Sequence, residues 1–599
     1  MATADDVIYN MSTQSEGSPA VFTKKDWLSI LDNQNQNYQG NQSVIDTSQL
    51  ANSNKYINYR EAYVTIPLLL TATSPINATA PQFAPATATV SADYAVGLKN
   101  WYGSVVHSFT CDYNGTTIIQ QTPYIGLWNT FKLMTSLSQD DLATQGAAIG
   151  FFPDTATSVG FTDAASGVDG VGTANNHNAP PFIKQSLVGQ FNPYNITNTG
   201  LFNRQQAWNF DFDGANASGT AAYSTLATTA NFTLLWKSYI ITKINASSTV
   251  PGVWQCAITA QVYLKHLHSF FERIPLLKGV FMKLTMNLNQ SSVSFTTAST
   301  AATSAIPGNV TFSAVTVQSP LGGVSPIMLA NGSIQTVDLS GSVVTLGQGG
   351  SVWGTSAGNI VSLAVGKTCL NSSQTALAGV GSSPLSGSIL LNVPAYSFNP
   401  VFEASYLSSP VKKIVYTDVY QYQVLGTAAN TTFNNLVTNG IANIKSVLIL
   451  PFYSPSTSST STGNRGLIPF QSPFDPAGGG PTSPLCLLTQ FNVQISGQNA
   501  IYNTERYEYE QFLNQFKGVN AINGGQEDGS TSGLIGQLDF DMEYCYYYVN
   551  CGRMLPVEEA VPKSINILGT NTSAKSIDMY IFVEYGVEVN VDILTGARV

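Results

Sequence analysis

The sequence predicts a mainly β protein made of two tandem copies of one domain. Residues 282–289 and 583–593 alternate apolar and polar side chains, as half-buried strands of antiparallel sheets do. Stretches with helical spacing are few and short. The pattern FTCDYNGTTII at residues 109–119 returns without a gap as FNVQISGQNAI at residues 491–501, 382 positions later. A repeat this long indicates a duplicated domain.

Each copy of the repeat predicts a β-hairpin followed by a helix. Asn114-Gly115 and Ser496-Gly497 supply the residues that tolerate a positive φ in a tight two-residue turn. Large apolar residues with helical spacing follow both turns. They are Tyr124, Trp128, Phe131 and Met134 in the first copy, and Tyr509, Phe512, Leu513 and Phe516 in the second. An alternating strand also precedes each hairpin, from residues 59 and 412, about 350 positions apart.

The composition indicates a large protein with an unusually uncharged surface. The chain has 599 residues, of which 43% are hydrophobic, so it can bury more than one core. Charged residues make up only 10%, against roughly 25% in typical soluble proteins. Surfaces that neighbouring subunits cover are often depleted of charge. We expect extensive assembly; the alternative is a secreted β protein whose surface is rich in Ser, Thr and Asn.

The charge pattern argues against direct binding of nucleic acid. The net charge is −10, and no run of Lys or Arg occurs. A grip on the phosphate backbone needs clustered basic residues. We therefore expect no direct nucleic-acid contact by this chain.

The cysteines and the N-terminus bear on the compartment. Six Cys residues are scattered without framework spacing, which favours small buried residues in a reducing compartment. The first ten residues contain two carboxylates and no apolar core of a signal peptide. No apolar stretch approaches the length of a membrane span. These features predict synthesis and assembly inside a cell.

Residues 1–56 are predicted to form an N-terminal arm with one short helix. Thr23 is a candidate cap, and Trp27, Leu28 and Leu31 form an apolar stripe with helical spacing. Such an arm either docks on a neighbouring subunit or accessory protein, or folds back on its own domain. Farther along, Ser, Thr, Ala, Gly and Asn dominate residues 145–205, 294–385 and 453–484. Their scarcity of charge favours long ordered loops over disordered linkers.

No residue pattern predicts a catalytic, cofactor or metal site. His266 and His268 form the closest histidine pair, but zinc needs a third and usually a fourth ligand, which the sequence does not offer. The carboxylate pairs Asp140-Asp141, Glu527-Asp528 and Glu558-Glu559 lack surrounding aromatic residues. Solvated or helix-capping roles therefore explain them better than glycoside hydrolysis.

Two segments resemble the double jelly-roll major capsid proteins of virophages, Polinton-like viruses and adintoviruses, within the adenovirus capsid lineage. Residues 390–422, LLNVPAYSFNPVFEASYLSSPVKKIVYTDVYQY, are similar to the family's segment between the last strand of the first jelly roll and the first strand of the second. Residues 273–289, RIPLLKGVFMKLTMNLN, are similar to a strand of the first jelly roll in the relatives from large eukaryotic DNA viruses.

The resemblance implies two antiparallel jelly-roll β-sandwich domains with short helices and long loops. The first would span residues 57–405 with large loop insertions, and the second residues 406–599. The helix after each hairpin would lie on an outer flank or a sheet edge, covering an open strand row.

The resemblance also implies a role. Family members form homotrimers whose six jelly rolls make a pseudo-hexameric capsomer in the icosahedral shell of a DNA virus. The expected partners are neighbouring capsomers, a penton protein and minor capsid proteins, and the expected location is the virion. The alternative is a carbohydrate-binding or adhesive β-sandwich protein of a surface or fibre, for which an export signal and exposed aromatic platforms would be expected.

Overall fold

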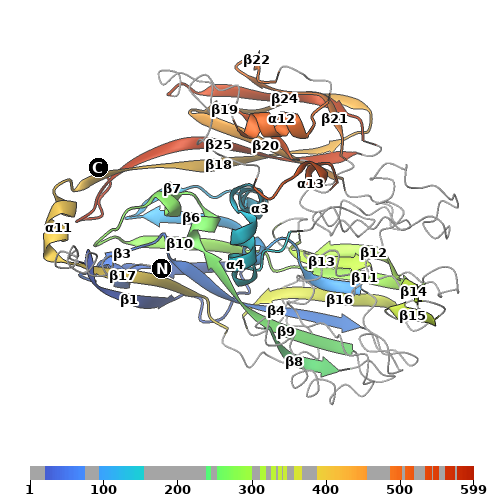
Figure 1. Ribbon diagram of the computed structural model, residues 1–599, viewed down its shortest axis with the longest axis horizontal. Helices are drawn as coiled ribbons and strands as arrows, with labels where there is room; N and C mark the ends of the chain where they lie inside the picture. The colour runs from blue at the N-terminus through green and yellow to red at the C-terminus, as the bar shows by residue number, and fades with distance from the viewer. Residues whose placement is uncertain are drawn as a thin grey trace, which may run out of the picture.

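The last third of the chain, from Val411 onward, folds into a sandwich with eight described strands, jelly roll 2 (Figure 1). Its described strands follow one another as β18 (Val411–Thr427), β19 (Thr431–Ile441), β20 (Ile444–Tyr453), β21 (Leu488–Ile495), β22 (Gln498–Asn499), β23 (Tyr547–Asn550), β24 (Lys563–Asn571) and β25 (Ile577–Asp592). They form two antiparallel sheets in the orders β18-β25-β20-β23 and β19-β24-β21-β22, called here the β18 sheet and the β19 sheet. In sequence order these are strands 1-8-3-6 and 2-7-4-5, the arrangement of a jelly roll.

The part of the chain before it, from Phe22 to Phe398, repeats this strand order as jelly roll 1. The corresponding strands are β1 (Phe22–Leu31), β2 (Gln42–Asp46), β4 (Tyr63–Ser74), β6 (Val106–Tyr113), β7 (Thr116–Ile119), β9 (Gly252–Tyr263), β10 (Met282–Leu288) and β17 (Leu390–Phe398). β1 pairs with β17, β17 with β4 and β4 with β9, which gives the β1 sheet. The β2 sheet has the order β2-β10-β6-β7. The fold is therefore a double jelly roll, as the sequence predicts.

The structure is a computed structural model of the chain. It describes residues 20–74, 94–153, 238–244, 252–299, 310–318, 321, 325–331, 335–339, 342–346, 356–366, 387–454, 486–501, 506–517, 533–542, 544, 546–551, 560–573 and 576–599.

Additional strands lengthen jelly roll 1 at one end (Figure 1). β4 pairs with β17 through its first residues and with β16 (Ser356–Val365) farther along. β11 (Ser292–Ser299), β12 (Val310–Gln318) and β8 (Ser238–Ile244) extend the same sheet, and β3 (Tyr56–Ile57) pairs with β17. β13 (Ile327–Asn331) pairs with β5 (Tyr94–Leu98), and β14 (Gln335–Leu339) with β15 (Ser342–Leu346). The expectation of a long loop at 294–385 is wrong where β11 to β16 lie, because period-2 alternation in Ser- and Thr-rich strands is weak.

The expected helix in the N-terminal arm is also wrong. Residues 22–31 form strand β1, which pairs with β17 along its length, and residues 42–46 form β2 of the opposite sheet. A ten-residue ladder satisfies more backbone groups than a short helix with a narrow apolar stripe. The first jelly roll therefore begins at Phe22 rather than at residue 57, which lies in β3. Residues 1–19 and 455–485 lie outside the described part of the chain.

Short helices connect the strands. They are α2 (Ser48–Ala51), η1 (Tyr102–Val105), α3 (Ile125–Ser136), α4 (Gln139–Ile149), α9 (Leu264–Leu267), α10 (Phe270–Arg273), α11 (Pro400–Leu407), α12 (Tyr509–Phe516) and α13 (Gln537–Met542). α11 joins the two jelly rolls, so the expected boundary at residues 405 and 406 falls within it. Asn399 caps α11 by accepting a hydrogen bond from the Val401 N–H, and Pro400 occupies its first turn. No helix among the described residues is long and apolar enough to cross a membrane.

Candidate assembly surfaces

The repeated hairpins occupy corresponding places in the two jelly rolls. Asn114 and Gly115 join β6 to β7, and Ser496 and Gly497 join β21 to β22, which are strands 4 and 5 of each jelly roll. Both residues of each turn have positive φ, 47° and 81° in the first and 50° and 84° in the second. This pair of values is typical of the two-residue turn that matches the twist of a hairpin.

The helices that follow the hairpins bury the residues that the sequence singles out, but in different surroundings. Trp128 and Phe131 of α3 are 5% and 1% exposed, and Phe512 of α12 is fully buried. Phe512 stacks on Phe540 within jelly roll 2, and Tyr509 is half-buried beside the same ring. α12 also covers the edge strand β23, where the Gln515 side chain accepts a hydrogen bond from the Asn550 N–H.

Helix α3 lies between the two jelly rolls instead of on an outer flank. Trp128 contacts Phe582 of β25, with ring centroids 6.3 Å apart, and Phe131 stacks on Tyr548 of β23 at 5.5 Å. Lys132 lies 4.0 Å from Glu584, a buried carboxylate on β25. The sequence predicts an outer flank or a sheet edge for this helix. The outer flank is wrong for α3, because the apolar outer face of the β18 sheet, including its edge strand β23, offers it more buried contact than solvent would.

A polar cluster next to α3 joins the same two units. Asp418 of β18 is 2% exposed and accepts hydrogen bonds from the backbone N–H groups of Gln120 and Val419 and from Nε2 of His268. Nδ1 of His268 accepts from the Phe270 N–H, so Nε2 carries the proton that His268 donates. Three donors thus converge on one buried carboxylate. We call α3, this cluster and the segments around them the junction.

Further hydrogen bonds surround Asp418 along β18. The Thr122 hydroxyl donates to the carbonyl oxygen of Val419 at 2.7 Å, and the Tyr416 hydroxyl donates to that of Ile118 at 2.6 Å. Ser269 donates to the carbonyl oxygen of Thr417. The partners in jelly roll 1 come from β7, from the chain that follows it and from the segment before α10. The junction therefore packs the outer face of the β18 sheet against the edge of jelly roll 1 that the β6–β7 hairpin forms.

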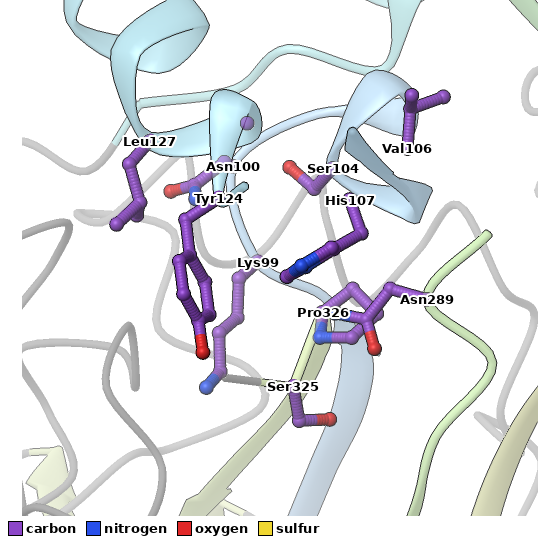
Figure 2. Close-up of a pocket in the computed structure, with 11 residues that line it drawn as sticks. Lys99, Asn100, Ser104, Val106, His107, Tyr124, Leu127, Asn289, Ser325 and Pro326 are labelled. Carbon is purple, nitrogen blue, oxygen red and sulfur yellow. The ribbon is translucent and has the colours of Figure 1, made fainter. Parts of the chain in front are cut away.

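A small pocket of about 30 Å³ lies beside the junction (Figure 2). Figure 2 shows Tyr124 and His107 on either side of Lys99. The His107 and Tyr124 rings are 4.7 Å apart, and Tyr124 in turn contacts Tyr580 of jelly roll 2 at 5.1 Å. Burial lowers the pKa of His107 to about 4, so the ring is neutral near pH 7. The pocket has room for roughly two water molecules.

The histidine pair does not form a shared site. His266 contacts Trp101 and Tyr263, whereas His268 points to Asp418. Burial, with a smaller effect of Lys265, lowers the pKa of His266 to about 4. Among the described residues, no three His, Cys, Asp or Glu side chains cluster as metal ligands would.

The first carboxylate pair caps a helix. Ser138 and Asp141 form a reciprocal capping box at the start of α4, and Asp140 lies in the same first turn. Glu527-Asp528 and Glu558-Glu559 lie outside the described residues. Four cysteines, Cys111, Cys256, Cys486 and Cys551, are buried thiols.

The residues expected to dock on a partner lie on one edge strand. Trp27 and Leu31 of β1 are 51% and 60% exposed, while Leu28 is half-buried against the core. Sequence reasoning missed two aromatic residues on the same sheet, Tyr63 and Tyr263, which the strand alternation places on the outer face. Their place could be found only once β1, β17, β4 and β9 were known to be neighbours.

The chain is similar to major capsid proteins. The mavirus major capsid protein superposes with a TM-score of 0.42 at 9% identity, over 100% of this chain and 94% of that one. The Faustovirus major capsid protein has a TM-score of 0.41 at 10% identity, over 98% and 94%. A chain of the Sputnik virophage structure has a TM-score of 0.48 at 12% identity, over 98% and 89%. No family model and no curated protein matches the chain.

Proposed function

We propose that this chain is the major capsid protein of an icosahedral DNA virus and works by assembly rather than catalysis. The observation that carries the proposal is the duplicated strand order, in which two jelly rolls of one topology are held side by side by a buried junction. Three such chains present six similar sandwiches, which suits a ring with pseudo-hexagonal outline.

The surface chemistry supports repeated contact with neighbours. Charged residues are 10% of the chain, and the exposed strand positions include uncharged polar residues, such as Thr432 and Asn434, and apolar ones, such as Val415. Flanks of this kind lose little solvation free energy when another subunit covers them, because few charges must be desolvated. The net charge of −10 leaves contact with the genome to other components.

The proposal places the protein in the virion, assembled in the host cell. Its partners would be two further copies in a homotrimer, neighbouring capsomers, a penton protein at the vertices and minor capsid proteins beneath the shell. Residues 1–19 are a candidate contact for the minor proteins.

The mass of the purified protein in solution tests the proposal. We expect a stable species of about three chain masses by light scattering, and hexagonal capsomers or shells by electron microscopy of expressed material. A monomer that forms no particles and binds immobilised glycans would instead support an adhesive or carbohydrate-binding surface protein.

A further inference from the structure

The pocket beside the junction is polar and lies where several segments of jelly roll 1 meet. It has a volume of about 30 Å³. Its lining residues are Lys99 and Asn100 after β5, Ser104 of η1, Val106 and His107 of β6, Tyr124, Gly126 and Leu127 at the start of α3, Asn289 after β10, and Ser325 and Pro326 before β13. The described residues that line it include the ammonium group of Lys99 and no carboxylate.

Lys99 brings a buried positive charge to this pocket. The residue is 2% exposed, and Figure 2 shows it between Tyr124 and His107. Its backbone N–H donates to the carbonyl oxygen of Pro326 at 2.9 Å, which fixes the start of the side chain. Burying an ammonium group costs free energy unless negative charge or acceptors surround it. The group has three donor hydrogens, so it can bind an anion in addition to other acceptors.

The N-terminal end of helix α3 adds a second positive region. Gly126 and Leu127 belong to its first turn and line the pocket. The first N–H groups of a helix point out of its N-terminal end, which therefore carries a partial positive charge. The first turn of this 12-residue helix holds no acidic residue, and the Tyr124 side chain makes no capping hydrogen bond. A helix end of this kind favours an anion.

Tyr124 enters α3 through a left-handed backbone conformation. Its φ is 55°, a value that costs free energy for a residue with a Cβ. Its ring lies 4.7 Å from that of His107 and 5.1 Å from that of Tyr580 in jelly roll 2. The strained residue therefore lines the pocket and contacts the second jelly roll at the same time.

We propose that the pocket binds a small monovalent anion of the size of chloride, between the Lys99 ammonium group and the N-terminal end of α3. The hydroxyl groups of Ser104 and Tyr124 are further donors at this pocket. Space for roughly two water molecules admits such an ion and excludes large organic anions. The buried ammonium group disfavours a cation. The site lies within one chain and does not depend on what that chain assembles into.

A bound anion would stabilise the junction. It would join the segment after β5 to the helix whose Trp128 and Phe131 pack against jelly roll 2. It would also offset part of the free energy that the left-handed Tyr124 costs. A ligand that binds the folded chain alone raises its unfolding temperature.

Thermal unfolding in two matched salts tests the proposal. Sodium chloride and sodium gluconate at equal concentration screen charges equally, but gluconate is too large for the pocket. We expect chloride to raise the unfolding midpoint of the wild type by about 1–2 °C over gluconate. Equal midpoints in the two salts would contradict the proposal.

One variant and one matched control locate the effect. Lys99→Met keeps the length of the side chain and removes its charge, so the difference between chloride and gluconate should disappear. Lys413→Met removes a lysine of β18 whose side chain is 56% exposed and paired with Glu588, and it should keep the full difference. An undiminished difference in folded Lys99→Met would overturn the assignment to this pocket.

Bromide locates the anion without a mutation, and it decides the matter if Lys99→Met does not fold. Bromide replaces chloride in such sites and scatters X-rays anomalously. Crystals of the wild-type protein grown in sodium bromide should show an anomalous peak within hydrogen-bond distance of the Lys99 Nζ. Ordered water in the pocket with no anomalous peak would overturn the proposal.

Discussion

Left-handed backbone conformations at single residues determine both repeated turns. Gly115 and Gly497 have φ of 81° and 84°, and a Cβ built on either meets no atom within 4 Å. An alanine at these positions therefore suffers no clash, and its cost comes from the backbone alone.

Gly115→Ala and Gly497→Ala should each lower the free energy of unfolding by about 1 kcal/mol. Gly440→Ala is the control, because Gly440 lies in exposed strand surroundings with no atom near its added Cβ and no positive φ. Denaturant unfolding measures all three. Equal effects at Gly440 and Gly115 would show that φ does not set the cost.

Two partly buried histidines give the fold a dependence on pH. His107 and His266 each have a pKa of about 4 in the folded chain, against 6.5 for an ordinary histidine. The unfolded chain takes up a proton at each near pH 6.5 while the folded chain does not. Their contribution to stability is thus fully present above pH 6.5 and is lost as the pH falls toward 4.

Between pH 7 and pH 4.5 we expect the free energy of unfolding to fall by about 2–3 kcal/mol for each of these histidines. The variant His107→Gln with His266→Gln should show a weaker fall over the same range. Denaturant unfolding at several pH values makes the comparison. The carboxylates Asp26 and Asp141, whose pKa values are lowered by hydrogen bonds, act mainly below this window.

At the scale of elements, sequence reasoning succeeds where contacts are local and fails where the partner is distant. The hairpins at Gly115 and Gly497 close through two residues, so their turn chemistry is visible in the sequence. Strand β1 pairs with β17, whose residues lie more than 350 positions later, and its own apolar spacing fits a helix equally well. The row of Trp27, Tyr63 and Tyr263 could not be predicted for the same reason, since β1, β4 and β9 become neighbours only through pairing between distant segments.

The position of β1 and β2 predicts the result of N-terminal truncation. Removing residues 1–19 leaves every described strand in place, so the chain should keep its unfolding transition. Removing residues 1–46 deletes two of the eight strands of jelly roll 1 and exposes the edges of β17 and β10. We expect that protein to be insoluble or to lose the cooperative transition, as circular dichroism and light scattering would show.

A soluble and fully cooperative 47–599 fragment would contradict the assignment of β1 and β2 to the jelly roll. The 20–599 fragment serves as the matched control, since it removes residues without removing a described strand. If the 20–599 fragment folded normally but formed no particles, residues 1–19 would be the part that contacts other shell components.

At the scale of the whole molecule, the junction couples the two jelly rolls. Asp418 accepts several hydrogen bonds at 2% exposure, and α3 buries Trp128 and Phe131 against jelly roll 2. Opening this interface exposes apolar surface and leaves buried donors without an acceptor. We therefore expect the intact chain to unfold in one transition.

Asp418→Ala should lower the free energy of unfolding by about 2–5 kcal/mol and separate the transitions of the two jelly rolls. The buried His268 and the Gln120 N–H would then lack their acceptor. Asp112→Ala is the control, because its carboxylate accepts a hydrogen bond from the exposed hydroxyl of Thr117 within the same hairpin. Differential scanning calorimetry distinguishes one peak from two. A single unshifted peak in Asp418→Ala would refute the coupling.

The placement of the last strand of each jelly roll beside its first has a consequence for biosynthesis. β1 is among the earliest strands to leave the ribosome, but its partner β17 ends at Phe398. At about 5–20 residues per second, β1 waits roughly 20–75 s for that partner. During this time its backbone groups and Trp27 stay open to other nascent chains. Dense translation of one message would therefore bring unfinished copies together, and a chaperone that holds this strand would raise the yield of soluble protein.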